Sequence, residues 1–278
     1  MSRSEKPVIG FVILVWNSEK VIGKCLDSII NLRSISPVAV LADNGSTDGS
    51  SDILRKYSND YPDIFSVITY ERNMGTTISR NIGLKELMKR DIDYYCILDS
   101  DTEVNDDAFI IMIDELRKNE KYGLIGPALA SSDGTKQMSA RCFPTLPEKI
   151  LKAVPVKRLQ KKGEAMEVQL PPSQNAASYP VDYLMSACWL MKPELLSKVG
   201  LLDEKIFYAP EDAEYCIRVW KSGYQAAFCP NAGIIHEWQR LSKKKLISKI
   251  NWEHIKGLIY MFKKHRYLFT SDNIKGHL

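Results

Sequence analysis

The first 130 residues alternate short apolar runs with longer amphipathic segments. Val8–Val15 is a continuous apolar run, which is typical of a strand buried on both faces of a sheet. The next segment, Glu19–Ile30, places its apolar residues at helical spacing. The pattern repeats, with further strands expected at Pro37–Ala42, Phe65–Tyr70 and Tyr94–Leu98, and further helices at Ser51–Tyr57, Thr76–Met88 and Asp106–Leu116. Strands that alternate with such helices predict an α/β fold, with a mostly parallel, Rossmann-like central sheet flanked by helices.

This alternation breaks down between Gly134 and Pro180. The stretch carries several prolines and a basic run, Lys157–Lys162. We therefore expect residues 131–180 to form a long, partly mobile excursion of the kind that makes lids or acceptor sites. Regular structure is expected again in three places: a strand at Val181–Met191, a helix from about Pro210 to just before Gly223, and a short strand that ends at His236.

The last residues, 241–278, are predicted to form a basic amphipathic helical segment. Apolar residues follow helical spacing from Leu246 to Phe262, and lysines occupy much of the other face. From Arg240 onward ten lysines and arginines stand against two acids, giving +8, so the rest of the chain carries −4 to reach the net charge of +4. Such a segment favours an anionic partner, here a membrane surface contacted through residues 242–267. The alternative is that its apolar face packs on the domain or on a second subunit of a homodimer.

The composition, with 45% apolar and 26% charged residues among 278, is typical of a soluble globular protein. No apolar run approaches the roughly 20 residues that span a bilayer, and no leader for secretion follows Met1. We therefore expect a cytoplasmic protein, with peripheral contact to the inner face of the cell membrane as a further expectation, and no nucleic-acid partner. The six cysteines are scattered without a CxxC pair, which gives no support to a zinc or redox motif.

Acidic residues follow the fourth predicted strand as Asp99-Ser100-Asp101. Two carboxylates spaced in this way can reach one crevice, where hard oxygen ligands hold Mg²⁺ or Mn²⁺ and leave room for phosphate oxygens. The alternative is a solvated acidic turn in which Asp101 or Thr102 caps the next helix. Asp43, at the end of the second strand, is either part of a plain turn or an acceptor for a pyrimidine N–H.

Two helix starts also carry candidate chemistry. Asn73–Gly75 offers backbone N–H groups to an anion, with Arg80 one turn further on. Glu211–Asp212 begins a helix, where acids are favoured even without a catalytic role. Since neighbours on a helix point to different sides, one carboxylate can face a substrate while the other is held. His236 ends a strand, where an isolated histidine is more often a core residue than a metal ligand. The polar strand ends nevertheless share one edge of a parallel sheet, which is where such sheets bind ligands.

These motifs occur in a specific order along the chain. They are Val15-Trp-Asn17, Asp43-Asn-Gly-Ser-Thr-Asp48, Asn73-Met-Gly75, Arg80-Asn-Ile-Gly83, Asp99-Ser-Asp101, Gly200-Leu-Leu-Asp203 with Phe207, Pro210-Glu-Asp212, Gly223-Tyr224 and His236. Over residues 7–240 this ordered set resembles the inverting glycosyltransferases of family 2, which have the GT-A fold. Arg141-Cys-Phe-Pro144 and the closing segment that ends at Lys264-His265 are similar, more narrowly, to the bacterial rhamnosyltransferase branch.

The resemblance implies a GT-A domain over residues 1–240, followed by the segment 241–278. Within the domain, residues 1–130 are the nucleotide-binding half, 131–180 the excursion, and 181–240 the acceptor and catalytic half. The implied activity is a metal-dependent inverting transfer, with Mn²⁺ or Mg²⁺, from dTDP-rhamnose or a UDP-sugar to a hydroxyl of a glycan or lipid-linked acceptor in cell-surface polysaccharide synthesis. The alternative is a non-catalytic sugar-nucleotide-binding or membrane scaffold protein with the same fold.

The resemblance also implies roles for individual residues. The nucleotide-sugar site comprises Trp16, Asn17, Asp43, Asn73, Gly75, Arg80, Asp99 and Ser100. The metal site comprises Asp101, Asp99 and His236, and the acceptor site Arg141, Trp189 and Glu211. Asp212 is the implied base, with Glu211 as the alternative. The chain departs from the usual pattern where Trp16 replaces a tyrosine and Val15 a threonine, and where Ser186-Ala-Cys188 replaces a Gly-Ala pair.

Overall fold

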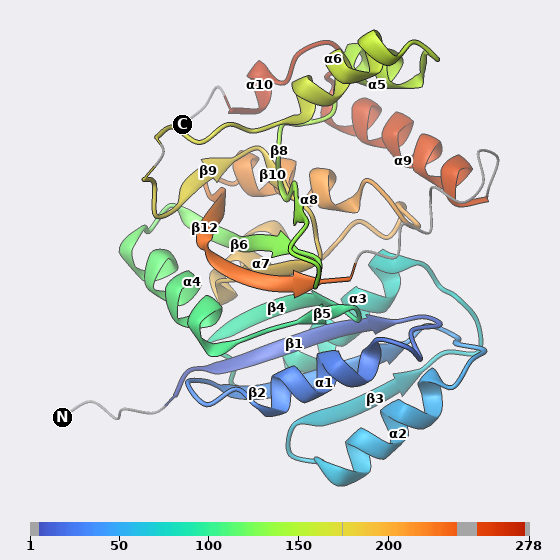
Figure 1. Cartoon of the computed structure of the whole chain (residues 1–278), viewed down its shortest axis with the longest axis vertical. Helices are drawn as coiled ribbons and strands as arrows, with labels where there is room; N and C mark the ends of the chain where they lie inside the picture. Colours follow the sequence, from blue (N-terminus) through green and yellow to red (C-terminus); the bar gives the residue numbers. More distant parts are fainter. Residues whose placement is uncertain (1–5, 174, 238–248, 276–278) are drawn as a thin grey trace.

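The computed structural model describes residues 6–173, 175–237 and 249–275, and its centre is a mixed β-sheet with helices on both faces (Figure 1). The strands are β1 (Val8–Val15), β2 (Ser36–Asp43), β3 (Phe65–Thr69), β4 (Tyr94–Asp99), β5 (Thr102–Glu103), β6 (Tyr122–Ala130), β7 (Lys136–Gln137), β8 (Ala140–Arg141), β9 (Tyr179–Val181), β10 (Tyr183–Leu184), β11 (Cys188–Met191) and β12 (Gln225–His236). The helices are α1 (Ile22–Ile30), α2 (Ser50–Asp60), α3 (Thr76–Leu87), α4 (Asp106–Lys118), α5 (Leu146–Ala153), α6 (Lys157–Glu167), α7 (Pro193–Val199), α8 (Glu211–Lys221), α9 (Lys249–His265) and α10 (Asp272–Lys275). The predicted α/β fold is confirmed.

The main sheet has ten strands, in the order β3-β2-β1-β4-β11-β6-β12-β5, with β7 paired to β6 and β9 to β12. β3, β2, β1 and β4 are mutually parallel, as are β6 and β12. The short strand β11 runs antiparallel between β4 and β6. Parallel neighbours need a crossover connection, and α1, α2 and α3 supply these connections in the first half of the chain.

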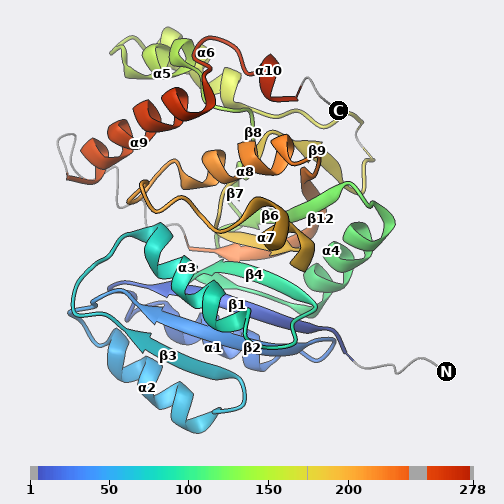
Figure 2. The same ribbon diagram turned by 180° about the vertical axis from the view of Figure 1, so that it is seen from behind.

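Side chains of β1 enter two cores, because successive residues of a strand point to opposite faces of the sheet. Phe11 and Ile13 pack in the core formed with α1, α2 and α4, which lie in front of the sheet in Figure 1. Val12 packs in the second core, on the side of α3, α7 and α8 that faces the viewer in Figure 2. All three side chains are completely buried. Burial on both faces explains why this strand is apolar along its whole length.

The excursion at residues 131–180 contains two helices, α5 and α6, that the sequence analysis did not predict. Thr145 begins α5, since its hydroxyl accepts from the N–H of Glu148 and Pro147 occupies a position at the helix start where its missing N–H costs nothing. β8 pairs with β10 in a separate two-stranded sheet. The role of residues 131–180 as a partly mobile excursion over the domain stays a prediction, whereas these short helices beside prolines show too little periodicity to be recognised from the sequence.

Helix α9, in the C-terminal segment, has apolar residues on two sides. Met261 and Phe262 are buried in the second core. Trp252, Ile255 and Ile259 are 59%, 48% and 50% exposed. The prediction was one apolar face and one basic face, and the described part of the helix does not divide in this way. The basic run and first apolar positions predicted between residues 240 and 247 lie outside the described residues, as does residue 277. None of the described helices is long and apolar enough to span a bilayer.

Candidate functional site

The carboxyl ends of β2, β1 and β4 lie side by side at one edge of the sheet. In the parallel register Val15 pairs with Asp43 and Leu14 with Asp99, so the residues that follow each strand emerge together. Trp16, directly after β1, is 37% exposed. The hydroxyl groups of Ser18 and Ser100 lie 2.8 Å apart and join the loop after β1 to the loop after β4. These strand ends meet at the edge where a parallel sheet is expected to bind ligands.

Asp99, Asp101 and His236 form a cluster at this edge, here called the strand-end group. One potential ligand atom from each residue lies within 4.8 Å of the other two. His236 Nε2 is 3.3 Å from Asp101 Oδ1 and 4.0 Å from Asp99 Oδ2. The antiparallel pairing of β12 with β5 sets His236 opposite Thr102 and thereby beside Asp101. Carboxylate oxygens and an imidazole nitrogen suit Mn²⁺ or Mg²⁺, so the residues present fit a divalent cation.

Gln137, on β7, fixes the orientation of the His236 ring. Its amide nitrogen donates to the His236 carbonyl at 2.7 Å and to Ser131 Oγ at 3.1 Å. Its Oε1, 2.7 Å from His236 Nδ1, is then the acceptor for an Nδ1–H. The other ring nitrogen, Nε2, faces the two carboxylates, which is the arrangement that a metal-binding histidine needs. Burial lowers the pKa of His236, but the hydrogen bond and charge of Asp101 outweigh it and raise the pKa overall.

Arg80, on α3, lies behind the acidic residues. Its Nη2 donates to Asp99 Oδ1 at 2.6 Å, and its Nη1 donates to Glu211 Oε1 at 3.1 Å and to Ser186 Oγ at 2.9 Å. Arg80 is only 2% exposed. That Arg80 flanks a nucleotide stays a prediction; in this structure its side chain is almost wholly buried and connects two carboxylates.

Glu211 and Asp212, at the start of α8, are here called the helix-start group. Glu211 Oε1 accepts from Arg80 and, at 3.0 Å, from the Ser186 hydroxyl, while Asp212 Oδ1 accepts from the N–H of Ala213 at 2.7 Å. Burial raises the pKa of Glu211 to about 8, with the charge of Asp212 adding to the shift and that of Arg80 opposing it. Burial also raises the pKa of Asp212, against the hydrogen bond from Ala213. Glu211 is thus buried and held, whereas Asp212 is only half-buried.

Asp43 uses its carboxylate within the protein. It is completely buried, and its oxygens accept from the Ser46 N–H at 3.0 Å and from the Ser51 hydroxyl at 2.5 Å. That Asp43 accepts a hydrogen bond from a pyrimidine stays a prediction, and in this structure its carboxylate is buried. The side chain stabilises the turn between β2 and α2.

The segment Asn73–Gly75, before α3, also satisfies its own polar groups. The N–H groups of residues 74, 75 and 76 donate to Asn44 Oδ1, Asn73 Oδ1 and the Phe207 carbonyl, at 2.7, 2.8 and 2.7 Å. Gly75 has φ 90°, and a Cβ there would lie 2.6 Å from the Phe207 carbonyl oxygen, so only glycine fits. The anion site at this helix start stays a prediction, since in this structure the three N–H groups donate to acceptors within the protein.

Arg141 lies beside the helix-start group. Its guanidinium pairs with Glu167 at 2.6 Å. Burial raises the pKa of Asp212, and the positive charges of Arg141 and Lys149 are among those that oppose this rise. The side chains of Arg141 and Lys149 keep 20% and 23% of their surface exposed. Two cations therefore stand near Asp212 at the end of the molecule that carries α5.

Trp189 lies in the second core of the protein. It is completely buried, its ring stacks on Tyr215 with a centroid separation of 5.7 Å, and its Nε1 donates to the Leu184 carbonyl at 3.3 Å. That Trp189 contacts an acceptor stays a prediction; in this structure it lies on β11, in the middle of the sheet between β4 and β6.

Tyr208, in contrast, is a residue of the site that the sequence analysis missed. It is 38% exposed. Burial raises its pKa to about 12, and the negative charges of Glu211, Asp99 and Asp212 add to the rise, so the phenol lies near both acidic groups. Its place directly after Phe207, in a motif already recognised, is the signal that could have found it.

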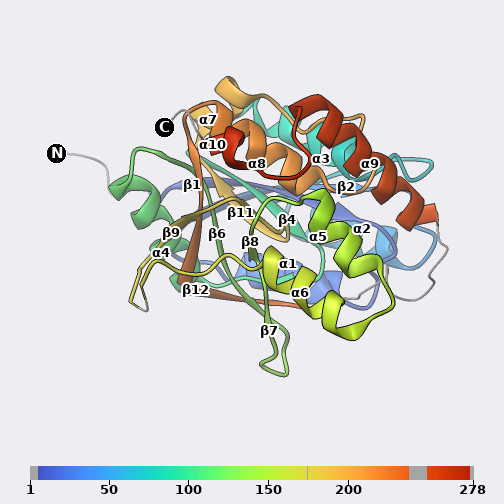
Figure 3. The same ribbon diagram turned by 90° about the horizontal axis from the view of Figure 1, so that it is seen from above.

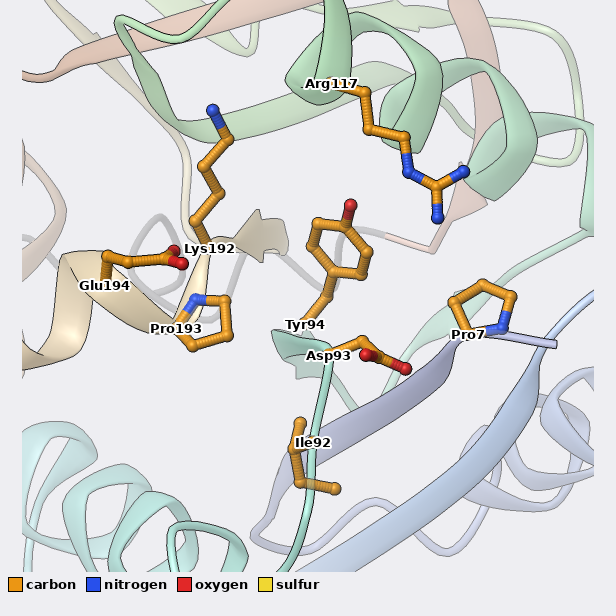
Figure 4. A pocket seen from close by; sticks show the side chains of 8 residues that line it. All are labelled: Pro7, Ile92, Asp93, Tyr94, Arg117, Lys192, Pro193 and Glu194. Atoms are coloured by element: carbon orange, nitrogen blue, oxygen red, sulfur yellow. The ribbon is translucent and has the colours of Figure 1, made fainter. Parts of the chain in front are cut away.

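A separate hollow of about 390 Å³ lies at the opposite edge of the sheet (Figure 4). Its lining residues are Pro7, Ile92, Asp93, Tyr94, Arg117, Lys192, Pro193 and Glu194. Pro7 and Tyr94 stand at the amino ends of β1 and β4, so the hollow is separated from the strand-end group by the length of β4, about 20 Å for a strand of this size. It shares no residue with either acidic group and is not the candidate site.

A model of the family described as Glycosyl transferase family 2 matches residues 11–200 of the chain. The match begins within β1 and ends just after α7, so it includes Asp99 and Asp101. It stops before the helix-start group and before His236, whose relation to the carboxylates comes from the structure.

Two curated proteins illustrate the likeness. N-acetylglucosaminyl-diphospho-decaprenol L-rhamnosyltransferase of Mycobacterium tuberculosis is 26% identical over 247 residues, which cover 85% of this chain and 78% of that protein. Poly(ribitol-phosphate) beta-glucosyltransferase of Bacillus spizizenii is 30% identical over 120 residues, which cover 42% of this chain and 18% of that protein.

Three solved structures have the same fold. GalNAc-T7 with UDP, GalNAc and Mn²⁺ gives a TM-score of 0.65 at 16% identity, over 92% of this chain and 48% of that chain. S. aureus TarS in complex with UDP-GlcNAc gives 0.62 at 16% identity, over 96% and 70%. The mannosyltransferase PcManGT from Pyrobaculum calidifontis, with GDP-Man and Mn²⁺, gives 0.58 at 16% identity, over 94% and 64%. The chain thus spans about half the length of the GalNAc-T7 chain.

Proposed function

Because the chain belongs to glycosyl transferase family 2 and has the GT-A fold, we propose that this glycosyltransferase moves a sugar from a nucleoside diphosphate to a hydroxyl group, with inversion at the anomeric carbon. One observation carries the proposal: the Arg80 guanidinium binds Asp99 at 2.6 Å and Glu211 at 3.1 Å, and so joins the strand-end and helix-start groups in one place. A cation-binding group beside a carboxylate base is what such a transfer requires.

The donor that we propose is dTDP-rhamnose or a UDP-sugar. The mycobacterial relative is a rhamnosyltransferase by name, and two of the structural relatives hold UDP or UDP-GlcNAc. At the end of β1 the exposed Trp16 offers an aromatic face on which a base can stack. Asn17 and Ser100, on the loops after β1 and β4, complete the donor side in this proposal.

The strand-end group is the proposed site for Mn²⁺ or Mg²⁺. The GalNAc-T7 and PcManGT structures contain Mn²⁺. When bound, such an ion acts as a Lewis acid that stabilises negative charge on the departing diphosphate. Arg80 holds Asp99 through Oδ1, and Gln137 holds His236 through Nδ1, which leaves Asp99 Oδ2 and His236 Nε2 4.0 Å apart, with Asp101 Oδ1 3.3 Å from the same Nε2.

Asp212 is the proposed base, with Glu211 as the alternative. The acceptor hydroxyl loses its proton to the base while its oxygen bonds to the anomeric carbon and the bond from that carbon to the diphosphate oxygen breaks, in an oxocarbenium-like transition state. Glu211 suits this role less well, because Arg80 and Ser186 occupy its Oε1 and a pKa of about 8 keeps it mostly protonated at neutral pH. Asp212 is the more accessible carboxylate of the pair.

The proposed acceptor is a glycan or lipid-linked molecule of cell-surface polysaccharide synthesis, and one that carries phosphate. The printed names of both curated relatives include phosphate groups, as diphospho-decaprenol and as poly(ribitol-phosphate). Arg141 and Lys149 place positive charge near Asp212. Cationic side chains in such a position favour phosphate oxygens.

The outward side of α9 is a proposed contact with an anionic membrane surface. Exposed Trp252, Ile255 and Ile259 are accompanied by exposed Lys256. Apolar side chains of this kind enter the lipid interface, and each lysine near an anionic surface adds about 1 kcal/mol. Replacement of the three apolar residues by serine should reduce co-flotation with phosphatidylglycerol vesicles, while Ile110→Ser, on the exposed side of α4, should not. Equal recovery of both variants would contradict the contact.

The proposed base is tested by Asp212→Asn. We expect sugar transfer to fall by about 10²–10⁴-fold, because the acceptor proton loses its destination, while calorimetry still shows Mn²⁺-dependent nucleotide binding. Asp107→Asn removes an exposed carboxylate from the first turn of α4 and serves as the matched control. If Asp212→Asn transfers sugar at the wild-type rate and Glu211→Gln does not, Glu211 is the base.

The scaffold alternative has its own signature. A non-catalytic protein would bind a nucleotide sugar without turning it over, whichever donor is offered. Incubation of the wild-type chain with a panel of dTDP- and UDP-sugars and Mn²⁺ should therefore release nucleoside diphosphate, through hydrolysis or transfer. The carboxylates of both acidic groups are present and converge, which favours the enzyme.

A further inference from the structure

Helix α9 lies against the segment that leads into α8 (Figure 3). Gly257 is the point of contact: a Cβ placed there would overlap with the carbonyl oxygen of Ala209 and lie 2.9 Å from Pro210 Cδ. Ala209 and Pro210 are the two residues that precede Glu211. Glycine is poorly suited to the middle of a helix. Its presence in α9 is explained by this close approach of the helix to the backbone that enters the helix-start group.

Two charged contacts of α9 hold the same part of the chain. Lys264 Nζ and His265 Nε2 lie 2.7 and 3.1 Å from Glu214 Oε1. Glu214 is completely buried in the first turn of α8. Lys264 Nζ is also 2.5 Å from Asp203 Oδ2, which accepts from the Tyr260 hydroxyl at 2.8 Å. Residues of one side of α9 therefore reach both the segment before the helix-start group and the turn after it.

The other side of this segment is fixed to α3. The carbonyl of Phe207 accepts from the N–H of Thr76, and that of Ile206 accepts from the Thr77 hydroxyl, both at 2.7 Å. Residues 203–210 thus lie between α3, on the donor side, and α9. The contacts with α3 and α9 together determine where α8 begins.

We propose that α9 positions the helix-start group for the reaction, with Gly257, Lys264 and His265 as positioning residues. The inference rests on the proposed function for the identity of the base. None of the three residues belongs to either acidic group, and their effect is on where Asp212 stands. Glu214 is buried and is also paired with Arg218 of its own helix at 3.0 Å, so removal of a partner from α9 leaves its charge only partly compensated. The start of α8 can relieve this charge by moving toward solvent, and Asp212 moves with it.

Lys264→Met and Lys263→Met form a matched pair, since they remove the same charge from neighbouring positions of α9. Lys263 is exposed, whereas Lys264 binds Glu214 and Asp203. With the acceptor in detergent, we expect Lys264→Met to lower kcat about tenfold or more, because small displacements of a catalytic group are costly. Lys263→Met should stay within about twofold of wild type. The Kd of the nucleotide with Mn²⁺ should be unchanged in both variants, and kcat is expressed per nucleotide-binding site. Gly257→Ala should behave like Lys264→Met.

Amide hydrogen exchange gives a second readout that does not depend on activity. In Lys264→Met we expect faster exchange over residues 211–215 and unchanged exchange in β1 and β4. If exchange rises equally in all elements, or if kcat per binding site matches that of Lys263→Met, α9 contributes only general stability and the proposal is overturned. Failure of the proposed function has a different signature. If Asp212→Asn is still active, Asp212 is not the base, but the difference in amide exchange between Lys264→Met and the wild type remains.

Discussion

The strand-end group and the helix-start group are neighbouring sets of acidic residues that the fold places by different means. Asp99 and Asp101 emerge where the parallel register of β4 with β1 puts them, and the pairing of β12 with β5 sets His236 beside them. The start of α8, in contrast, depends on side chains from α3, from the loop before β11 and from α9. The first arrangement is a property of the sheet, and the second is a property of contacts between distant segments.

This difference predicts unequal sensitivity to change. A strand register rests on a series of backbone hydrogen bonds, so that one altered side chain leaves it in place. The helix-start group depends on a small set of buried charged contacts, and each such contact is costly to break from one side. Changes outside the site should therefore disturb Glu211 and Asp212 more than Asp99 and Asp101.

The largest expected effect comes from Arg80→Met, which removes the link between the two groups. Glu211 loses a buried partner at 3.1 Å and Asp99 loses one at 2.6 Å. At about pH 9, where Glu211 is ionised, we expect the free energy of unfolding, measured by urea titration, to fall by about 3–5 kcal/mol, because a buried carboxylate is left without its cation. Nucleotide binding with Mn²⁺ should survive in the fraction that stays folded, since the strand register does not depend on Arg80.

Arg90→Met is the control for this change. Arg90 is exposed just beyond α3, so its replacement should alter the free energy of unfolding by less than about 0.5 kcal/mol. If the free energy of unfolding falls equally in the two variants, the buried contacts of Arg80 contribute no more to stability than an exposed arginine does. That result would remove the basis for treating the two groups as one site.

The same contrast explains how much of the site could be predicted from the sequence. β1, β2 and β4 were recognisable because buried parallel strands are continuous apolar runs that end in polar residues. Once these strands were assigned, Asp99 and Asp101 followed as neighbours of the sheet edge. The place of His236 beside Asp101 depends on β5, a strand of two residues that leaves no periodic pattern.

Long-range contacts are what local patterns did not show. Gln137 also lies on a strand of two residues, and Trp189 resembles a binding residue until β11 is seen to lie between β4 and β6. Helical spacing identified α9, yet apolar residues on two sides, such as Met261 and Ile259, left its inward side undecided. The sequence places Arg80 within the helix that follows Gly75, but the ion pairs of Arg80 with Asp99 and Glu211 are formed only in the folded chain.

The next largest effect should appear in the pH dependence of stability, because two carboxylates one turn apart on α8 have opposite shifts. Burial raises the pKa of Glu211 to about 8, so its contribution to stability is present below about pH 4.5 and is lost as the pH rises through 8. For Glu214 burial is outweighed by the hydrogen bond from His265 and the charge of Arg218, which lower the pKa to about 2. Its contribution, on the order of 3 kcal/mol, is present above about pH 4.5 and is lost as the pH falls toward 2.

Urea titrations of two variants separate these contributions. Glu211→Gln should flatten the stability profile between about pH 4.5 and pH 8 and leave its acid limb unchanged. Glu214→Gln should remove part of the acid limb of the stability profile, below about pH 4.5. Between about pH 4.5 and pH 8 its pH dependence should be the same as that of the wild type. Parallel profiles for the two variants would mean that the carboxylates share one environment, against the view that α9 and Arg80 act on them separately.

The smallest of these effects concerns the strand-end group and the hydrogen bond from His236 to Gln137. Gln137→Leu removes the acceptor for His236 Nδ1–H, which lies at 2.7 Å, and frees the ring to turn or to change tautomer. We expect the affinity for Mn²⁺, measured by calorimetry in the presence of nucleotide, to fall by about 10–100-fold, as is typical when a partner behind a metal-binding histidine is lost. Gln137→Glu keeps an oxygen for Nδ1–H while it gives up the donor to the His236 carbonyl, and so should retain more of the affinity for Mn²⁺ than Gln137→Leu does.

If both variants bind Mn²⁺ as tightly as the wild type, the orientation of His236 comes from the β12–β5 pairing alone. The strand-end group would then owe its geometry wholly to backbone register, and the contrast with the helix-start group would be sharper than the side-chain contacts suggest.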